Sequence, residues 1–483
     1  MVALHSPLPY EEPDLRERPQ PGSADAVLAG NRAATVYQRR VGRAVFVAVL
    51  VAFGAFVAPR TAQPASRYAL TASLVDQHSV DIGHYQAMLG VDRALFDGHL
   101  RSDKGPGQPV LAAPFYLLAR AVGAPAISAK PRKTDDLMLW WLTLTTSVLP
   151  LALLAALVYR RCARVAPKGA LPAALTLLLA SIALPVSTSL FAHALSALLG
   201  YAAYALIVDT WPSRWRMLAA GALAAAAIAT EYQLVIVAVV VAGLALWRAP
   251  KRFHLFVLGA IPPLAGLAWY QWRAFGSPWQ TPFKYYAGVI DGQTHGGYTV
   301  PKLAWLYDST LGNRGLLLMC PIVLVGVLAA IAVVAKRPAY RREGVVALVV
   351  FVLYLALVSG WSGTPLLEDP GPRYMIAAFP FLAMPLALCW RRMRLVAICA
   401  ALWGGWLMIA AATTDELVGI GESPIRQYVQ DLSHRHFLPT VWTLELGPNG
   451  AWIYAASVVL VSWWLVRTYR RRSHHSHERV WIH

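Results

Sequence analysis

A short polar stretch interrupts a chain that is otherwise mostly apolar. It reads "FDGHLRSDKGPGQPVLAAPF", residues 96–115, and its polar side chains include Asp97, His99, Arg101, Asp103 and Lys104. Pro106 fixes its own φ and the flanking glycines permit unusual backbone angles, so the turn holds Lys104 in a defined place. A lysine held in this way suits a phosphate or pyrophosphate as a point charge. The alternative is a lysine that reaches from an apolar surface to water.

Carboxylates are the second chemical feature of this region. The segment 60–136 contains, among others, Asp76, Asp81, Asp92, Asp97 and Asp103. Carboxylates beside a membrane surface are what a general base or a site for a divalent cation needs, although each one alone is also explained as a solvated loop residue. Asp103 adjoins Lys104, and we expect these two side chains to form an ion pair. Asp81 lies near His84 and Tyr85, a cluster that becomes a candidate metal site if another carboxylate joins it.

Three further ionisable residues stand at the ends of apolar segments. His193 lies in "STSLFAHALSALLG", Glu231 in "AIATEYQL" and Arg373 in "EDPGPRYMIAAF". Ionisable groups at such depths are functional candidates, but a histidine can equally be a packing residue. Arg373 needs an anionic partner, which is either a carboxylate of the same loop or a substrate phosphate.

The elements that must position these residues are membrane spans. The chain has 483 residues, of which 57% are hydrophobic and 14% are charged, whereas a soluble domain has about 25% charged residues. Apolar stretches near 20 residues recur along its length and predict an all-α, polytopic membrane protein in contact with lipid. The net charge of +18 resides in short basic runs between these stretches. It therefore indicates loops that set topology, and we expect no nucleic-acid partner.

The basic runs alternate along the chain, and this alternation predicts the topology. Every second loop is basic, and basic loops face the cytoplasm. We therefore expect a protein of the plasma or inner membrane with both termini in the cytoplasm. We expect a disordered tail at 1–40, a transmembrane domain at 41–467 and a basic tail at 468–483. About twelve spans fit the pattern: 41–58, 137–159, 169–187, 190–208, 216–229, 231–248, 254–274, 314–335, 344–360, 374–390, 394–412 and 450–467.

The first extracytoplasmic loop, 60–136, is expected to contain helices that lie on the membrane. "RYALTASLV" has helical spacing, and "YQAMLGVDRALF", residues 85–96, is a second short amphipathic stretch that includes Asp92. Residues 110–128 are apolar enough to span, but a span here would place six basic clusters outside. We therefore expect an interfacial or re-entrant helix at 110–128.

The order of these features resembles that of the GT-C membrane glycosyltransferases related to protein O-mannosyltransferases and to the lipid A aminoarabinose transferases. "SRYALTASLV" and "SDKGPGQP" match the "RY" and Lys-Pro-Pro regions of their first outer loop, and "LFAHALSALL" falls where relatives carry a second-loop carboxylate. "YDSTLGNRGLLLMCP" and "GPRYMIAAFPFL" resemble later segments. The resemblance covers roughly residues 40 to 410. One position departs from the pattern, since Ala65 and Ser66 stand where the family has a catalytic aspartate before "RY".

The resemblance implies a glycosyltransferase of the cell envelope that takes a sugar from a polyprenyl-phosphate donor and transfers it with inversion. Arg67, Lys104, His193, Glu231 and Arg373 would bind substrate. A loop aspartate would deprotonate the acceptor hydroxyl. We expect Asp92 to be this base, because the apolar residues around it would press a short helix onto the membrane, with Asp81 as the second choice. No cofactor is certain, and a divalent cation remains an open possibility.

A transporter or lipid-glycan flippase is the competing interpretation, and a membrane scaffold without chemistry is a third. Transporters usually contain structural repeats and broken helices near the middle of the membrane. The sequence shows no repeat between its halves, and its charged groups cluster at the expected outer surface.

Overall fold

The computed structural model describes residues 24–130, 135–287, 289–290, 293–294, 298–361, 369–415, 417–419 and 421–476. Residues 1–23 of the expected tail and residues 477–483 of the basic tail lie outside this part. Residues 24–40, which we expected in the disordered tail, are helical instead, because α1 runs Ala24–Phe53. This segment is rich in alanine and other good helix formers, so it extends the first apolar helix towards the N-terminus.

The described chain is almost entirely helical. After α1, the first loop contains α2 (Ala62–Asp76), the 3₁₀ helix η1 (Gly83–Met88), strands β1 (Ala94–Phe96) and β2 (His99–Arg101), and α3 (Gly107–Ala121). The following helices are α4 (Asp135–Thr143), the π-helix η2 (Leu144–Val148), α5 (Leu149–Val165), α6 (Pro167–Leu179), α7 (Ala183–Thr188), α8 (His193–Val208), α9 (Arg214–Thr230), η3 (Tyr232–Leu234), α10 (Val235–Arg248), η4 (Pro250–Arg252) and α11 (Phe253–Phe275).

The second half continues in the same way. It consists of η5 (Pro282–Tyr285), the two-residue strands β3 (Val289–Ile290) and β4 (Gln293–Thr294), α12 (Leu303–Thr310), α13 (Leu316–Met319), α14 (Pro321–Lys336), η6 (Pro338–Tyr340), α15 (Arg341–Ser359), η7 (Arg373–Ala378), α16 (Phe379–Thr413), α17 (Pro424–Ser433), α18 (Val441–Leu446) and α19 (Asn449–Ser476).

Many of these helices are apolar enough for a bilayer. Within the described residues, five helical stretches are long and apolar enough to cross it: Asp135–Val165, Pro250–Phe275, Pro338–Ser359, Arg373–Thr413 and Asn449–Arg470. Four shorter apolar helices accompany them: Pro167–Leu179, His193–Val208, Tyr232–Arg248 and Pro321–Lys336. The chain is therefore a polytopic, all-α membrane protein, as the composition predicts.

The longest helix, α16, covers two of the expected spans, 374–390 and 394–412. Leu382 packs on Gly326 of α14, and Gly404 packs beside Pro321 of the same helix. A straight helix would hold Leu382 and Gly404 about 33 Å apart, whereas the two contact points on α14 are separated by only about 8 Å. The helix therefore turns back on itself near its exposed basic residues, and its two halves run in opposite directions as the two spans require.

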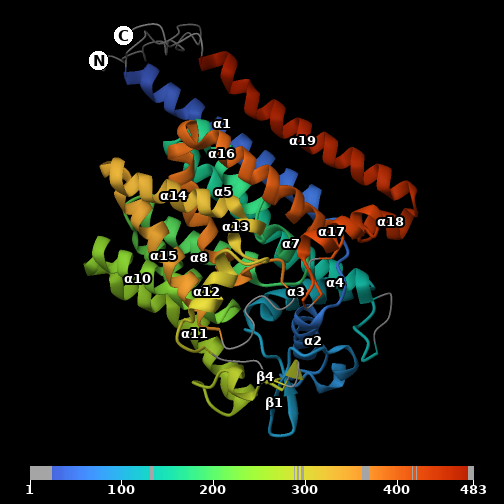
Figure 1. The fold of residues 1–483 in the computed structure, drawn as a ribbon. Helices are drawn as coiled ribbons and strands as arrows, with labels where there is room; N and C mark the ends of the chain where they lie inside the picture. The colour runs from blue at the N-terminus through green and yellow to red at the C-terminus, as the bar shows by residue number, and fades with distance from the viewer. Residues whose placement is uncertain are drawn as a thin grey trace, which may run out of the picture.

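The two ends of the helical bundle differ. The start of α1 and the end of α19 lie together at one end, whereas α2 and β1 lie at the opposite end (Figure 1). The hydroxyl of Tyr37 in α1 donates to the carbonyl of Tyr469 in α19 at 2.7 Å, which ties the two terminal helices together. The first loop thus covers the end away from the termini, as the expected topology requires.

A short β-hairpin replaces the helix that we expected at 85–96. β1 pairs antiparallel with β2, Phe96 opposite His99, so that Asp97 and Gly98 form the connecting turn. Both turn residues have positive φ, 51° and 74°, as a type I′ hairpin turn demands. The amphipathic pattern of this segment was thus misinterpreted, and Asp92 lies in the irregular chain between η1 and β1 rather than on a helix.

Helix α3 corresponds to the ambiguous apolar segment 110–128. Its 15 residues are about 22 Å long, which is too short for the hydrocarbon core of a bilayer. One face, with Ala112 and Tyr116, is buried, while Val110, Leu117 and Leu118 are exposed. An amphipathic helix with these properties fits the expected interfacial position.

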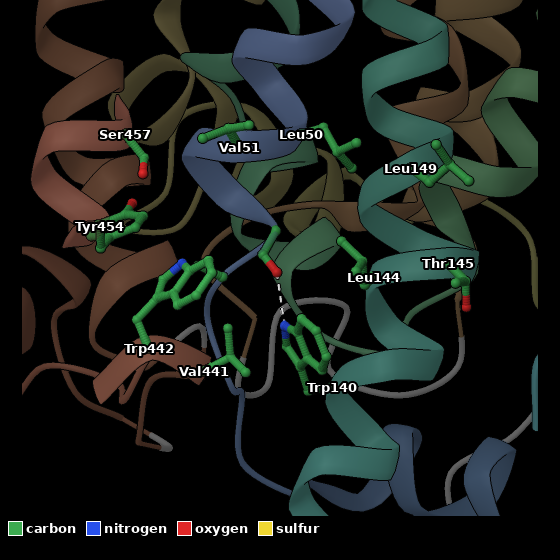
Figure 2. A pocket seen from close by; sticks show the side chains of 12 residues that line it. Leu50, Val51, Trp140, Leu144, Thr145, Leu149, Val441, Trp442, Tyr454 and Ser457 are labelled. Atoms are coloured by element: carbon green, nitrogen blue, oxygen red, sulfur yellow. Dashed lines mark hydrogen bonds between the residues drawn. The ribbon is translucent and has the colours of Figure 1, made fainter. Parts of the chain in front are cut away.

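An apolar cavity of about 430 Å³ lies where α1, η2, α5, α18 and α19 meet. Figure 2 shows Trp140 below this space, where its indole N–H donates to the carbonyl of Gly54 at 2.8 Å. The lining contains Leu50, Leu144 and Trp442 among other residues and no charged side chain. This cavity is therefore distinct from the polar site described next.

Candidate functional site

Lys104 is held between two carboxylates. Its Nζ donates to Oδ1 of Asp92 at 2.8 Å and to Oδ2 of Asp103 at 2.7 Å. The Lys104 and Asp92 side chains are 13% and 15% exposed, and that of Asp103 is 5% exposed. The expected ion pair between Asp103 and Lys104 is therefore present, and Asp92 makes a second pair that the sequence did not predict.

The glycine-rich turn places this lysine against the end of α9. A Cβ on Gly105 would lie 2.7 Å from the carbonyl oxygens of Ala229 and Thr230, and one on Gly107 would lie 2.7 Å from the backbone nitrogen of Thr230. Only glycine permits so close an approach of two backbones. The turn therefore brings Lys104 next to the residue that follows α9, which is Glu231.

Glu231 forms a buried ion pair with Arg67 of α2. Nη2 of Arg67 donates to Oε1 of Glu231 at 2.5 Å, and the two side chains are 1% and 8% exposed. The amide of Gln233 donates to the other carboxylate oxygen at 3.0 Å. Nδ1 of His193 lies 3.9 Å from Oε1 of Glu231. Three of the predicted residues thus meet at the junction of the first loop with α8 and α9.

Arg373 enters the site from the other half of the chain. Its guanidinium pairs with Asp369, and it also lies over the rings of Phe191 and Tyr374, 5.5 and 5.6 Å from their centroids. The ring of Tyr374 makes an edge contact with His193, with centroids 5.6 Å apart. The local carboxylate that the sequence offered as one partner of Arg373 is therefore its partner in this structure.

Several buried polar atoms in this cluster have no hydrogen-bond partner among the described residues. These atoms are Nε and Nη1 of Arg67, Nε of Arg373 and Nε2 of His193, and all of them are buried. Buried polar groups are nearly always hydrogen-bonded, so such orphan atoms require an explanation. Two guanidinium groups with unused N–H donors are suited to an anion with several oxygen acceptors.

The charges of the cluster act on one another. Lys104, Arg373 and Arg67 all lie within electrostatic range of Asp92, and Lys104 also acts on Glu231. The structure therefore brings together six of the seven predicted site residues: Arg67, Asp92, Lys104, His193, Glu231 and Arg373.

Asp81 is the predicted residue that lies elsewhere. Its Oδ2 pairs with Nδ1 of His99 at 2.5 Å and with Nη1 of Arg101 at 3.4 Å. These contacts fasten the hairpin to the preceding loop. Across the described part of the chain, no group of three His, Cys, Asp or Glu side chains is placed to hold a metal ion, so the metal site considered at Asp81 and His84 gains no further ligand there.

The two carboxylates beside Lys104 differ in their pKa. Burial alone would raise the pKa of Asp92, but the Lys104 ammonium outweighs burial and lowers the pKa below its usual range. Burial dominates at Asp103 and raises its pKa to about 6, against the opposing effect of Lys104. Burial opposes the charge of Lys104, yet Asp103 and Asp92 together raise the pKa of the lysine. At neutral pH Lys104 is therefore firmly charged.

Sequence reasoning missed the serines at this site. Oγ of Ser66 lies 2.9 Å from Oγ of Ser102 and donates to Oδ1 of Asp103 at 3.3 Å. Ser66 stands where the resemblance led us to look for an aspartate, and the carboxylate of Asp103 lies beside it instead. The signal was present in the adjacent "SDK", but sequence spacing cannot show that residues 66 and 103 meet.

Comparisons with known proteins give a likeness at the level of structure. No protein-family model and no curated protein sequence matches the chain. Among solved structures, it matches the crystal structure of ArnT from Cupriavidus metallidurans bound to undecaprenyl phosphate, with 13% sequence identity and a TM-score of 0.45. The chain is similar to ArnT. The match covers 92% of this chain and 76% of that one. The proposal below rests on this chain's own side-chain contacts.

Proposed function

We propose that the chain is a membrane glycosyltransferase that moves a sugar from a polyprenyl-phosphate donor to an extracytoplasmic acceptor, which is a lipid, a glycan or a protein. The observation that carries the proposal is the convergence of Arg67, Lys104 and Arg373 at one end of a membrane bundle. These cations come from α2, from the turn before α3 and from the start of η7. Arg67 and Arg373 keep buried N–H donors without a partner among the described residues. A membrane-bound phosphate ester supplies the missing acceptors.

The donor phosphate would bind between these cations. Guanidinium groups bind phosphate oxygens through paired hydrogen bonds, whereas an ammonium acts as a point charge. Phosphate leaves the sugar as an anion, so fixed positive charges at this place stabilise the charge that develops in the transition state. The polyprenyl tail would remain in the bilayer, which explains why the site lies at the membrane surface.

Asp92 is our proposed base. Its carboxylate would take the proton of the acceptor hydroxyl while the acceptor oxygen attacks the anomeric carbon. The bond from that carbon to the phosphate oxygen breaks, and the polyprenyl phosphate leaves with the electron pair. Because attack and departure occur on opposite faces of the sugar, the anomeric configuration is inverted. Glu231 would accept hydrogen bonds from hydroxyl groups of the sugar, and Nε2 of His193 would contact the sugar or the phosphate.

The location of the charges argues against a transporter. Transporters bind their substrates near the middle of the membrane, between broken helices. Here the charged residues of the cluster lie at the ends of α8 and α9, at the start of η7 and in the first loop. A chemical step on a lipid headgroup is consistent with this position.

The test is transfer itself. Purified full-length protein would be incubated with labelled polyprenyl-phosphate sugars and an acceptor extract, and release of the label from the lipid would be followed. We expect Asp92→Asn to keep donor binding but to lose transfer by roughly 10²–10⁴-fold, the usual scale for general base catalysis. Lys104→Ala should instead weaken donor binding by roughly 2–5 kcal/mol.

Asp97→Asn is the matched control, because it makes the same change at the exposed tip of the hairpin. It should leave binding and transfer unchanged. If Asp92→Asn transfers sugar at the wild-type rate while Asp103→Asn does not, the base is Asp103. A wild-type protein that binds none of the polyprenyl-phosphate sugars and releases no label would contradict the proposed function.

A further inference from the structure

A charged cavity lies at the opposite end of the bundle from the candidate site, where α1 meets α5. It has a volume of about 300 Å³, and its lining includes Arg39 and Arg43 of α1 and Arg160 of α5. Its floor is apolar, formed by Phe46, Leu153 and Ala156. The cavity thus joins three positive charges to an apolar surface within two membrane helices.

The arginines of this cavity lack the carboxylate partners that nearby arginines in the sequence have. Arg161 is buried and donates from Nε to Asp209 at 2.6 Å, and Arg164 donates from Nη1 to the other oxygen of Asp209 at 2.9 Å. Arg160 precedes both in the chain and lines the cavity. It makes no ion pair with any described residue, and the same holds for Arg39 and Arg43. Three adjacent cations without carboxylates repel one another unless an anion lies between them.

The packing holds Arg160 over this space. A Cβ on Gly42 would lie 3.0 Å from Cγ of Arg160 and 3.1 Å from its Cδ, so the aliphatic part of the arginine lies directly on the glycine. One turn away, Nε2 of Gln38 donates to the carbonyl of Ala163 at 3.0 Å, which fixes α1 against α5. The cavity is therefore part of a tight helix contact and not a gap between loosely placed side chains.

We propose that this cavity binds the phosphate headgroup of an anionic membrane phospholipid. Its three arginines would contact the phosphate, and Phe46 and Leu153 would contact the first part of an acyl chain. Basic pockets between transmembrane helices bind such headgroups. By the alternation of basic loops this end of the bundle faces the cytoplasm, where anionic lipids attract basic residues. The proposal does not depend on the glycosyltransferase function, which concerns the other end of the molecule.

The test measures lipid retention. Full-length protein in a mild detergent would be titrated with phosphatidylglycerol or with phosphatidylcholine of the same acyl chains, and bound lipid would be counted by native mass spectrometry. We expect preferential retention of phosphatidylglycerol, and a loss of about tenfold or more in its affinity when Arg39, Arg43 and Arg160 are all changed to Gln. A triple change to Lys should keep most of the affinity.

Three further measurements separate a built site from general charge. Arg391, Arg392 and Arg394 carry the same total charge on the exposed turn of α16, so changing all three to Gln should leave retention as in the wild type. Ala156→Phe fills the cavity without changing charge and should also release the lipid. Inorganic phosphate at millimolar concentration should not displace it, because the apolar floor contributes to binding.

Three outcomes would overturn the proposal. The first is equal retention in the wild type and in the Arg39, Arg43 and Arg160 triple Gln variant. The second is an equal loss in the control on α16, which would show an effect of net charge alone. The third is displacement by inorganic phosphate, which would show an anion site without lipid specificity. Thermal unfolding in phosphatidylcholine confirms that each variant is folded.

Discussion

At the scale of single residues, the pairing of Lys104 with two carboxylates is the most consequential contact. The carboxylates of Asp92 and Asp103 offset the positive charge of Lys104 and would compete with a phosphate for its ammonium group. Since burial raises the pKa of Asp103 to about 6, this competitor loses its charge under mildly acidic conditions. The balance of charge around Lys104 therefore depends on pH.

This dependence gives a prediction for Asp103. As the pH falls through about 6, Asp103 takes up a proton, Lys104 is less fully neutralised, and the donor should bind more tightly by on the order of tenfold, or roughly 1.4 kcal/mol. A polyprenyl-phosphate sugar is a phosphodiester and does not titrate in this range, so the change would come from the protein. Binding isotherms of donor between pH 5 and 8 measure it.

Asp103→Asn removes the competing charge at every pH. This variant should bind the donor at pH 8 as tightly as the wild type does at pH 5, with little further change on acidification. The stability of the wild type should fall as pH rises from about 4 to 6, because the folded protein holds this proton more tightly than the unfolded chain does. A pH profile that Asp103→Asn leaves intact would exclude Asp103 as its source.

Sequence reasoning selected most of the residues that the structure brings together at Lys104, and the reason is physical. An ionisable side chain beside an apolar span is costly without a role or a partner, so Lys104, His193, Glu231 and Arg373 could be selected from their surroundings. Arg67 was selected only through the resemblance of the "RY" segment. Asp81 and Asp92 could not be distinguished, because both lie in a loop whose path depends on contacts far apart in sequence.

At the scale of elements, the loop between α2 and α3 shows where sequence reasoning fails. "MLGVDRALF" has helical spacing, but the "DG" that follows it directly is a strong hairpin signal. We gave weight to the periodicity and missed the turn. The spans were easier to predict, since a long apolar segment has few alternatives in a membrane, and even the two halves of α16 correspond to the two spans expected from sequence.

The glycine-rich turn before α3 gives a prediction at this scale. Gly105→Ala introduces a Cβ only 2.7 Å from two carbonyl oxygens at the end of α9, so the turn must move away and carry Lys104 with it. A displacement of about 1 Å can reduce the rate by roughly 10²-fold. Single-turnover transfer rates for the wild type and the variant would measure the loss.

Gly243→Ala is the matched control for this variant. Gly243 lies in α10, and a Cβ there would meet no other atom within 4 Å. This change should leave transfer intact, and thermal unfolding should show that both variants are folded. Undiminished transfer in Gly105→Ala would mean that the close approach of the turn to α9 has no part in placing Lys104.

At the scale of the whole molecule, the two ends of the bundle carry different chemistry. The site lies with the first loop, and the arginine cavity lies with the termini. If the alternation of basic loops gives the correct topology, the first end is extracytoplasmic and the second is cytoplasmic. A lipid-linked donor fits the first assignment, since nucleotide sugars are not available outside the cell.

Cysteine labelling tests this orientation. In a variant that lacks Cys162, Cys320, Cys389 and Cys399, a single cysteine at position 97 should react with a membrane-impermeant reagent in intact cells. A cysteine at position 164 should react only after the cells are permeabilised. Both positions are exposed in the fold, so reagent access depends on the side of the membrane. The reverse pattern would invert the topology and place the site in the cytoplasm.

The ion pair between Arg67 and Glu231 has a consequence for biosynthesis. Its two residues are 164 positions apart, and Arg373 follows much later in the chain. At about 5–20 residues per second, the ribosome has already delivered the first loop to the membrane many seconds before its partners emerge. During this interval the charges of the loop must stay hydrated at the surface. The site therefore closes late in assembly, when the later spans have been inserted, and a chain interrupted before them would leave the loop undocked.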